Sequence, residues 1–149
     1  MTREPLYAAV FAFFSALTVG ASPAFATATR KIKTWEDCGI EQQPALLMRQ
    51  MAERSTYKKG FPLVWRCDIA LMLYVHTGAQ MDDTVVPSQL LNPLLDAIEA
   101  AVRVDDPGNQ AATLGGLVSH CAIEGDVQIF EGSLGDEAVA VVPLMFLTS

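Results

Sequence analysis

Histidine and cysteine, which supply much of protein catalysis and metal binding, are scarce in this sequence. It contains 2 histidines and 3 cysteines. The cysteines are odd in number and lie far apart in the sequence, at Cys38, Cys67 and Cys121. This argues against a disulfide framework and a zinc knuckle, and it favours a reducing compartment. The sequence also lacks G-x-S-x-G and H-E-x-x-H, and Gly115-Gly116 lacks the lysine of a phosphate-binding loop. These absences argue against the common hydrolases, zinc enzymes and nucleotide-binding proteins.

Positive charge is also in short supply. The chain has 10 Lys and Arg against 17 Asp and Glu, which gives a formal net charge of -7. A protein that wraps duplex DNA needs a positive face to neutralise phosphates, so this class is disfavoured. An acidic surface suits solubility, or a conduit that does not grip nucleic acid. At 149 residues the chain has the size of one domain, and we expect a single domain over residues 1–149.

The most regular pattern in the chain runs from Leu63 to His76, between Pro62 and Gly78. Apolar residues occupy every second position: Leu63, Trp65, Cys67, Ile69, Leu71, Leu73 and Val75. A period of two predicts a strand with one dry face, and its length exceeds that of most strands, so we place it at the centre of a sheet. The other face carries Arg66, Asp68, Tyr74 and His76, and we expect that face to meet solvent or another subunit.

Residues 1–26 allow two interpretations. Leu6 to Val19 is mostly apolar, and Ala24-Phe25-Ala26 matches an A-x-A signal-peptidase site, so the segment resembles a secretory signal. However, Glu4 cancels the charge of Arg3, which leaves a poor positive n-region.

A folded helix explains the same segment, and we favour it. Thr2 is a suitable N-cap, Pro5 suits the first turn, and Gly20 is a suitable stop. One apolar stripe at helical spacing consists of Leu6, Val10, Phe13, Phe14 and Leu17. The run is too short to span a membrane.

The remaining elements have weaker patterns. Residues 25–33 predict a short strand and residues 36–43 a polar loop, while residues 45–54 favour a helix by propensity but suit a buried strand equally well. Asn92-Pro93 marks the best start of a second helix, after a loop over residues 77–86, although residues 88–91 could form an earlier turn. Its apolar stripe consists of Leu94, Leu95, Ile98, Ala101 and Val102.

The C-terminal part predicts two long strands. They cover residues 117–130 and 138–147, and residues 131–136 have hairpin chemistry. Pro143 indicates an edge strand or a bulge. We therefore predict a two-layer α+β fold in the order α-β-β-β-α-β-β, with a mixed or antiparallel sheet of about five strands and both helices packed on one face.

Few residues are candidates for chemistry. His120-Cys121 could form a nucleophile, but neighbours on a strand point to opposite faces, so we expect a structural cysteine. His76 and His120 could bind a metal with Asp82 or Asp83, although ordinary hydrogen bonds explain them better. Acidic doublets in turn-like stretches are typical caps: Asp82-Asp83, Asp105-Asp106 and Asp136-Glu137. We predict that the chain is not an enzyme and holds no metal or cofactor.

The order of elements over the whole chain carries a further clue. The features are a helix entered by residues 3–10, an extended segment at 43–48, the long strand around 65–69, a helix at 90–98, and paired C-terminal strands ending in 138–143. This pattern resembles the tail terminator, or tail completion, proteins of long-tailed bacteriophages. The resemblance implies that residues 45–51 form a strand, against their helix propensity.

The resemblance implies a structural virion protein at the head-proximal end of the tail, assembled in the host cytoplasm. Such proteins form a hexameric ring that caps the tail tube, stops its growth and presents a surface for the head. The implied partners are further copies of the chain, the tail tube protein and a head-completion or neck protein. DNA would only pass through an acidic lumen, without specific binding, and no membrane is involved.

A ring of this kind joins unlike patches of neighbouring subunits. Our hypothesis pairs a basic group with an acidic group on a neighbouring subunit or on the tube; the alternative is that both are solvated surface. The basic group is Arg30, Lys31, Lys33, Lys58 and Lys59, and the acidic group is Asp82, Asp83, Asp105 and Asp106.

Two other functions compete with the ring. In the first, cleavage after Ala26 leaves an exported small binding protein. It explains the A-x-A site, but it would strip one helix from the sheet and leave three cysteines unpaired. In the second, the chain is a small thiol enzyme that uses Cys121, which strand geometry disfavours.

Overall fold

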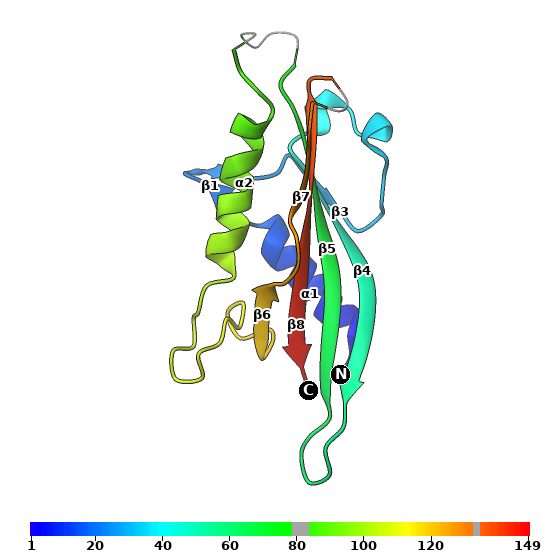
Figure 1. The fold of residues 1–149 in the computed structure, drawn as a ribbon, viewed down its shortest axis with the longest axis vertical. Helices are drawn as coiled ribbons and strands as arrows, with labels where there is room; N and C mark the ends of the chain where they lie inside the picture. Colours follow the sequence, from blue (N-terminus) through cyan, green and yellow to red (C-terminus); the bar gives the residue numbers. More distant parts are fainter. Residues whose placement is uncertain (79–83, 133–134) are drawn as a thin grey trace.

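The chain combines two helices with a mixed sheet, so the predicted α+β class is confirmed (Figure 1). The computed structural model describes residues 1–78, 84–132 and 135–149. The elements in order are α1 (Arg3–Ser15), β1 (Thr18–Val19), β2 (Ser22–Pro23), β3 (Thr27–Thr29), the 3-10 turns η1 (Trp35–Asp37) and η2 (Ile40–Gln42), β4 (Ala45–Thr56), β5 (Val64–His76), α2 (Ser88–Ala101), β6 (His120–Ile123), β7 (Gln128–Glu131) and β8 (Glu137–Thr148).

The main sheet has six strands, more than the five expected. Its order is β3-β4-β5-β8-β6, and β7 also pairs with β8. β3 runs parallel to β4, whereas every other pair in this sheet is antiparallel. β1 and β2 form a separate small hairpin.

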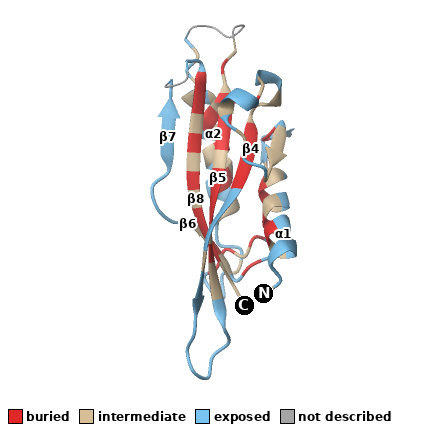
Figure 2. Cartoon of the chain, turned by 90° about the vertical axis from the view of Figure 1, so that its right-hand side faces the viewer, coloured by how far each residue is buried: buried red, intermediate tan, exposed pale blue. Residues whose placement is uncertain are grey.

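The central position of β5 is confirmed, since it pairs with β4 along one side and with β8 along the other. Its predicted dry face is buried from Cys67 to Val75, while Trp65 is half-buried and Leu63, just before the strand, is exposed. The pattern therefore weakens only where β4 and β5 extend into a hairpin beyond the body of the molecule (Figure 2).

β4 covers residues for which propensity favoured a helix, so that preference is wrong and the strand implied by the resemblance is present. β5 on one side and β3 on the other bind its first residues, and these pairings override the local preference. The register shifts between Gln50 and Ala52, which leaves Met51 as a β-bulge.

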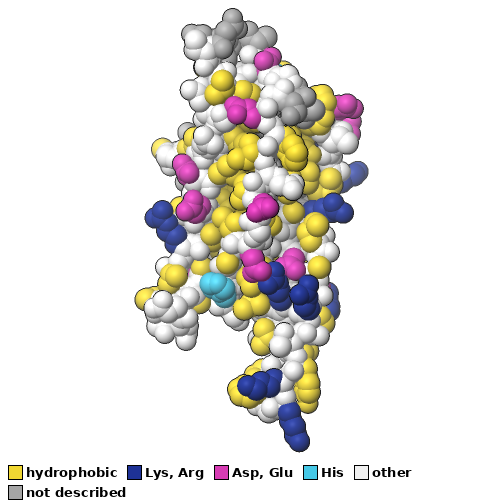
Figure 3. Space-filling model, viewed as in Figure 1, with side chains coloured by type: hydrophobic (Ala, Val, Ile, Leu, Met, Phe, Trp, Pro, Cys, Tyr) yellow, Lys and Arg dark blue, Asp and Glu magenta, His cyan; other side chains and the backbone are white. Residues whose placement is uncertain are grey.

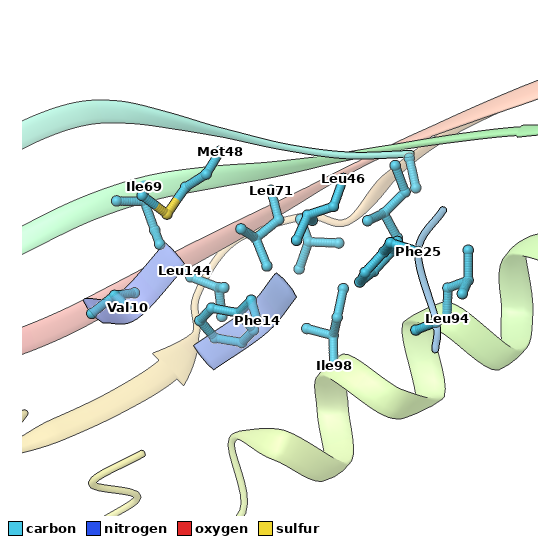
Figure 4. Packing of buried hydrophobic residues seen from close by; sticks show 14 of the residues in the cluster. Val10, Phe14, Phe25, Leu46, Met48, Ile69, Leu71, Leu94, Ile98 and Leu144 are labelled. Atoms are coloured by element: carbon cyan, nitrogen blue, oxygen red, sulfur yellow. The ribbon is translucent and has the colours of Figure 1, made fainter. Parts of the chain in front are cut away.

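Both helices cover the same face of the sheet, as predicted. Val10 and Phe14 of α1 and Leu94 and Ile98 of α2 belong to one buried cluster with the dry face of the sheet (Figure 4). Phe25, beside the start of β3, joins the same cluster. The first helix is therefore part of the core.

The α1 prediction missed one core residue. Tyr7 is only 1% exposed, and its hydroxyl donates to Glu53 Oε1 on β4 at 3.1 Å. Arg3 Nε donates to Glu53 Oε2 at 2.7 Å. Thr2 occupies the N-cap position but makes no side-chain cap hydrogen bond. The helix is thus fixed by polar contacts to β4 as well as by its apolar stripe.

α2 begins at Ser88, so the earlier turn considered for residues 88–91 is present and the favoured start at Asn92-Pro93 is one turn too late. Leu91 N–H donates to Pro87 O at 3.1 Å, which shows helical bonding before the proline. Pro93 lies inside the helix. The extra turn adds Leu91 to the buried stripe.

The single strand predicted over residues 117–130 is also wrong. The segment forms β6 and β7, which pair with successive parts of β8. Pro143 lies between those parts in a strand paired on both sides, so it marks neither an edge nor a bulge. Its carbonyl accepts Glu124 N–H at 3.1 Å, just after β6 ends and before β7 begins.

The sheet face away from the helices is partly covered by the chain itself. Cys38, Ala45, Leu47 and Tyr74 form a second buried cluster beneath the η1–η2 segment. The Tyr74 hydroxyl donates to the Lys33 carbonyl at 2.7 Å. The expectation that Tyr74 faces solvent or a subunit is therefore wrong.

Candidate interaction surfaces

The basic residues proposed as one interface fall in two separate places. Arg30, Lys31 and Lys33 follow β3, which pairs with Ala45–Leu47 at the start of β4. Lys58 and Lys59 follow the end of the same twelve-residue strand, at the tip of the β4–β5 hairpin (Figure 1). Arg30 reaches Gln50 in the middle of β4, so at about 3.3 Å per residue the part of β4 from Gln50 to Thr56 keeps it about 20 Å from the tip.

The group after β3 is only partly free to bind a partner. Arg30 forms an ion pair with Glu4 of α1, and its second guanidinium nitrogen lies 3.2 Å from that carboxylate. Hydrogen bonding from Arg30 lowers the pKa of Glu4. Lys31 is exposed, and it makes no ion pair among the described residues.

The hairpin tip combines lysines with exposed aromatic rings. Tyr57 and Phe61 are 79% and 61% exposed, and Lys58 Nζ lies 4.5 Å from the centre of the Phe61 ring. Hydrophobic and basic side chains project together at the lower end of the molecule (Figure 3). Exposed aromatic rings are typical of protein-binding surfaces, and the lysines add positive charge beside them.

Two of the four predicted acidic partners, Asp105 and Asp106, are engaged in hydrogen bonds within their own loop. Asp82 and Asp83 lie outside the described residues. Asp105 accepts the Gly115 N–H at 2.9 Å and the Thr113 hydroxyl at 3.0 Å, and hydrogen bonds from the Gly115 and Thr113 backbone lower its pKa. Asp106 accepts the Asn109 amide at 2.8 Å. Both described aspartates therefore hold their own loop together.

Sequence reasoning missed an acidic and apolar border on the opposite side of the sheet. Glu124 and Asp126 are exposed just before β7. Glu124 lies 3.0 Å from Arg66, which also bonds Asp68 at 2.9 Å. Ile129 and Phe130 of β7 are 48% and 46% exposed. Because the sequence predicted one continuous strand here, it gave no reason to expect an open edge.

The cysteines are all buried and free. Cys121 lies in the core, and burial raises the pKa of its thiol to about 12. The neighbouring His120 instead accepts the Ala112 N–H through Nδ1 at 3.2 Å. Cys67 also lies in the core, as predicted. This environment disfavours a thiolate nucleophile at Cys121.

A metal site at His76 or His120 with Asp82 or Asp83 was considered from the sequence, and both aspartates lie outside the described residues. The described residues contain no group of three His, Cys, Asp or Glu side chains that could hold a metal ion. His76 Nδ1 accepts the Gly78 N–H at 2.7 Å, and its Nε2 lies 3.7 Å from Glu137. Burial raises the pKa of Glu137, and His76 opposes that shift.

A pocket of about 460 Å³ opens between α2, the β1–β2 hairpin and the end of β5. Apolar residues dominate its lining, and Gln43 Oε1 is buried there without a hydrogen-bond partner. The lining within the described chain contains no cysteine or serine nucleophile. The pocket therefore suits an apolar group and gives no indication of catalysis.

Neither described helix has the combined length and apolar character needed to cross a bilayer. In comparisons with known proteins, no family model matches the chain, and no curated protein is significantly similar to it.

Proposed function

We propose that the chain is a tail terminator of a long-tailed bacteriophage, a structural protein whose ring caps the tail tube and ends its polymerisation. The observation that carries the proposal is β4. Its residues favour a helix by propensity, whereas the resemblance to this family required a strand at residues 45–51. The helix, central strand and helix that the resemblance also required are present in the same order.

The β4–β5 hairpin supplies a surface for the tube. It extends beyond the core, and its tip presents Lys58 and Lys59 beside exposed Tyr57 and Phe61. In this proposal the two lysines meet carboxylates of the tube protein, and the rings bury apolar surface there. The head-completion or neck protein binds the side of the ring that faces the head.

The ring is proposed to be a hexamer in the virion, assembled in the host cytoplasm. The formal net charge of -7 supports a lumen through which DNA slides without adhering, because carboxylates repel phosphates and offer no counterion release. No membrane and no specific nucleic-acid binding are involved. An inner wall that proved basic in an imaged ring would contradict the proposed transit.

Electron microscopy of negatively stained samples tests the proposal. We expect the purified protein to form rings, and we expect it to cap one end of tail tubes from the phage that encodes it. The double variant Lys58→Glu/Lys59→Glu should lose capping. Arg103→Glu, an exposed charge after α2, is the matched control and should cap normally. Bare tube ends with the wild-type protein would refute the function.

The exported binding protein is less well supported by the same structure. Cleavage after Ala26 would remove Tyr7, Val10 and Phe14 from the core. Ala24 is buried, and its N–H donates to the Leu17 carbonyl at 2.9 Å, so the A-x-A site is folded into the molecule. Intact mass of the protein purified from its host separates the two functions, since loss of 26 residues would favour export.

A further inference from the structure

β3 and β7 each have an edge without a strand partner in the described chain. β3 is the outermost strand on one side, and β7 is an outer strand on the other. Figure 2 shows β7 at the border of the sheet, with its exposed residues on the outside. An unpaired edge is a template for a strand of another chain.

The two edges lie at the same level of the sheet. The strand pairings, followed from β3 through β4, β5 and β8, show which residue of β7 is level with each residue of β3. Thr27 is level with Phe130, Ala28 with Ile129, and Thr29 with Gln128. The strand directions along this path make β3 and β7 antiparallel. A second copy placed beside the first without rotation in the plane of the sheet would thus bring its β3 against β7 in antiparallel orientation.

The backbone of β7 has its free hydrogen-bonding groups at Ile129. Gly132 N–H donates to Glu137 O at 3.1 Å, so the backbone groups of Gly132 point toward the chain of β8. This bond fixes which residues of β7 point their backbone groups toward β8. Since successive residues turn their backbone groups to opposite sides, Gln128 and Phe130 face β8. The N–H and C=O of Ile129 therefore point away from the sheet.

The backbone of β3 has its free groups at the matching position. Thr27 N–H donates to Pro44 O at 3.5 Å, so Thr27 and Thr29 face β4. Ala28 between them faces outward. Ala28 is level with Ile129, and two outward-facing residues directly opposite each other can exchange both backbone hydrogen bonds.

The side chains at these edges also fit one another. β7 has no lysine or proline, the residues that commonly protect an edge, and it exposes Ile129 and Phe130. β3 presents only threonine and alanine, which leave room for larger rings. Continuing the same register by two residues places Lys31 opposite Asp126. Both are exposed, and neither forms an ion pair within the described chain.

We infer that β7 of one copy pairs antiparallel with β3 of the next, with Ile129 opposite Ala28 and Asp126 opposite Lys31. The contact joins two different patches, so repetition of it can close a ring. In this contact Lys31, from the basic group after β3, has Asp126 as its acidic partner in place of Asp105 or Asp106. The inference rests on the proposed ring, because it needs a second copy.

A cysteine pair tests this register. Thr29 and Gln128 would be opposite residues whose backbones do not bond each other, with Cα atoms about 4.5 Å apart, which is within the range of a disulfide. The variant Thr29→Cys/Gln128→Cys should form a ladder of disulfide-linked multimers on mild oxidation. Each single variant should remain monomeric in denaturing gels. Ala28→Cys/Gln128→Cys, shifted by one residue and pointing to opposite faces, is the matched control.

The outcomes separate the inference from the proposed function. A ladder from the in-register pair that exceeds the control at least tenfold, with the linked peptides identified by mass spectrometry, supports the pairing. Rings seen by microscopy without that ladder overturn the pairing and leave the tail terminator function standing. A wild-type protein that is monomeric by light scattering, alone and with tail tubes, overturns both.

Charge reversal gives a second readout that leaves the strands intact. Lys31→Asp should reduce the assembled fraction in light scattering by at least tenfold. The combined variant Lys31→Asp/Asp126→Lys should restore it. If the combined variant assembles as poorly as Lys31→Asp alone, then Lys31 and Asp126 do not lie opposite each other. Circular dichroism of each variant checks that the exposed substitutions leave the fold unchanged.

Discussion

The ring of Tyr7 packs edge-on against Phe146, with the ring centres 5.6 Å apart and the planes at 69°. Tyr7 belongs to α1 and Phe146 to β8, so the contact joins the first helix to a strand near the other end of the chain. The Tyr7 hydroxyl also reaches Glu53 of β4. One side chain thereby connects the helix layer to two strands.

Replacing Tyr7 should therefore destabilise the whole fold. We expect Tyr7→Ala to lower the free energy of unfolding by about 3–5 kcal/mol, because it leaves a cavity beside Phe146. Tyr7→Phe, which removes only the hydroxyl, should cost about 1 kcal/mol. Urea denaturation measures both. Tyr57→Ala, at the exposed hairpin tip, is the control and should change stability by less than about 0.5 kcal/mol.

A chain that begins at Thr27 should not fold cooperatively. Without α1, the sheet would expose apolar residues that Val10 and Phe14 now cover. We expect residues 27–149 to lack a sharp thermal transition and to bind a hydrophobic dye, whereas residues 1–149 melt in one step. A stable truncated chain would instead strengthen the exported interpretation.

The Cys121 thiol should resist alkylation in the native protein. With its pKa raised to about 12 by burial, its thiolate fraction at pH 8 is about one in ten thousand. Iodoacetamide should label Cys121 only after denaturation, as mass spectrometry of the digested protein would show. Rapid native labelling accompanied by loss of function would revive the thiol-enzyme interpretation.

Asp105 should stabilise the fold at neutral pH and lose that effect in acid. Because backbone hydrogen bonds lower its folded-state pKa, its contribution is present above the ordinary aspartate pKa of about 3.9 and disappears as the pH falls through the lowered value. Asp105→Asn should therefore be less stable than wild type at pH 7, and the difference should shrink in acid. Urea denaturation of both proteins at pH 7 and in acid measures the difference.

The sequence was most informative where one kind of contact determines the structure. Along β5 every second side chain enters the same core, so the alternation of residues predicts the strand and its buried face. In β4 the good helix formers Leu46 to Met48 are held by two neighbouring strands. No local pattern contains those neighbours, so the residues alone left helix and strand open, and the family resemblance favoured the strand.

The candidate interface was harder to predict, because charge alone does not show which groups are already engaged. Asp105 and Lys31 look equally available in the sequence. In the structure Asp105 is enclosed by hydrogen bonds from its own loop, whereas Lys31 remains exposed beside an open strand edge. The break between β6 and β7, which creates the other edge, depends on pairing with β8.

The bulge at Met51 affects how this chain aligns with related sequences. Because Met51 is an extra residue, Glu53 pairs opposite Cys67 and lies on the helix side of the sheet, where it meets Arg3. If the strand continued from Gln50 without the bulge, Glu53 would pair opposite Arg66 and turn to the other side. A strand without the bulge can therefore keep the Arg3–Glu53 pair only if it also loses one residue, which a sequence alignment would show as a one-residue gap at position 51.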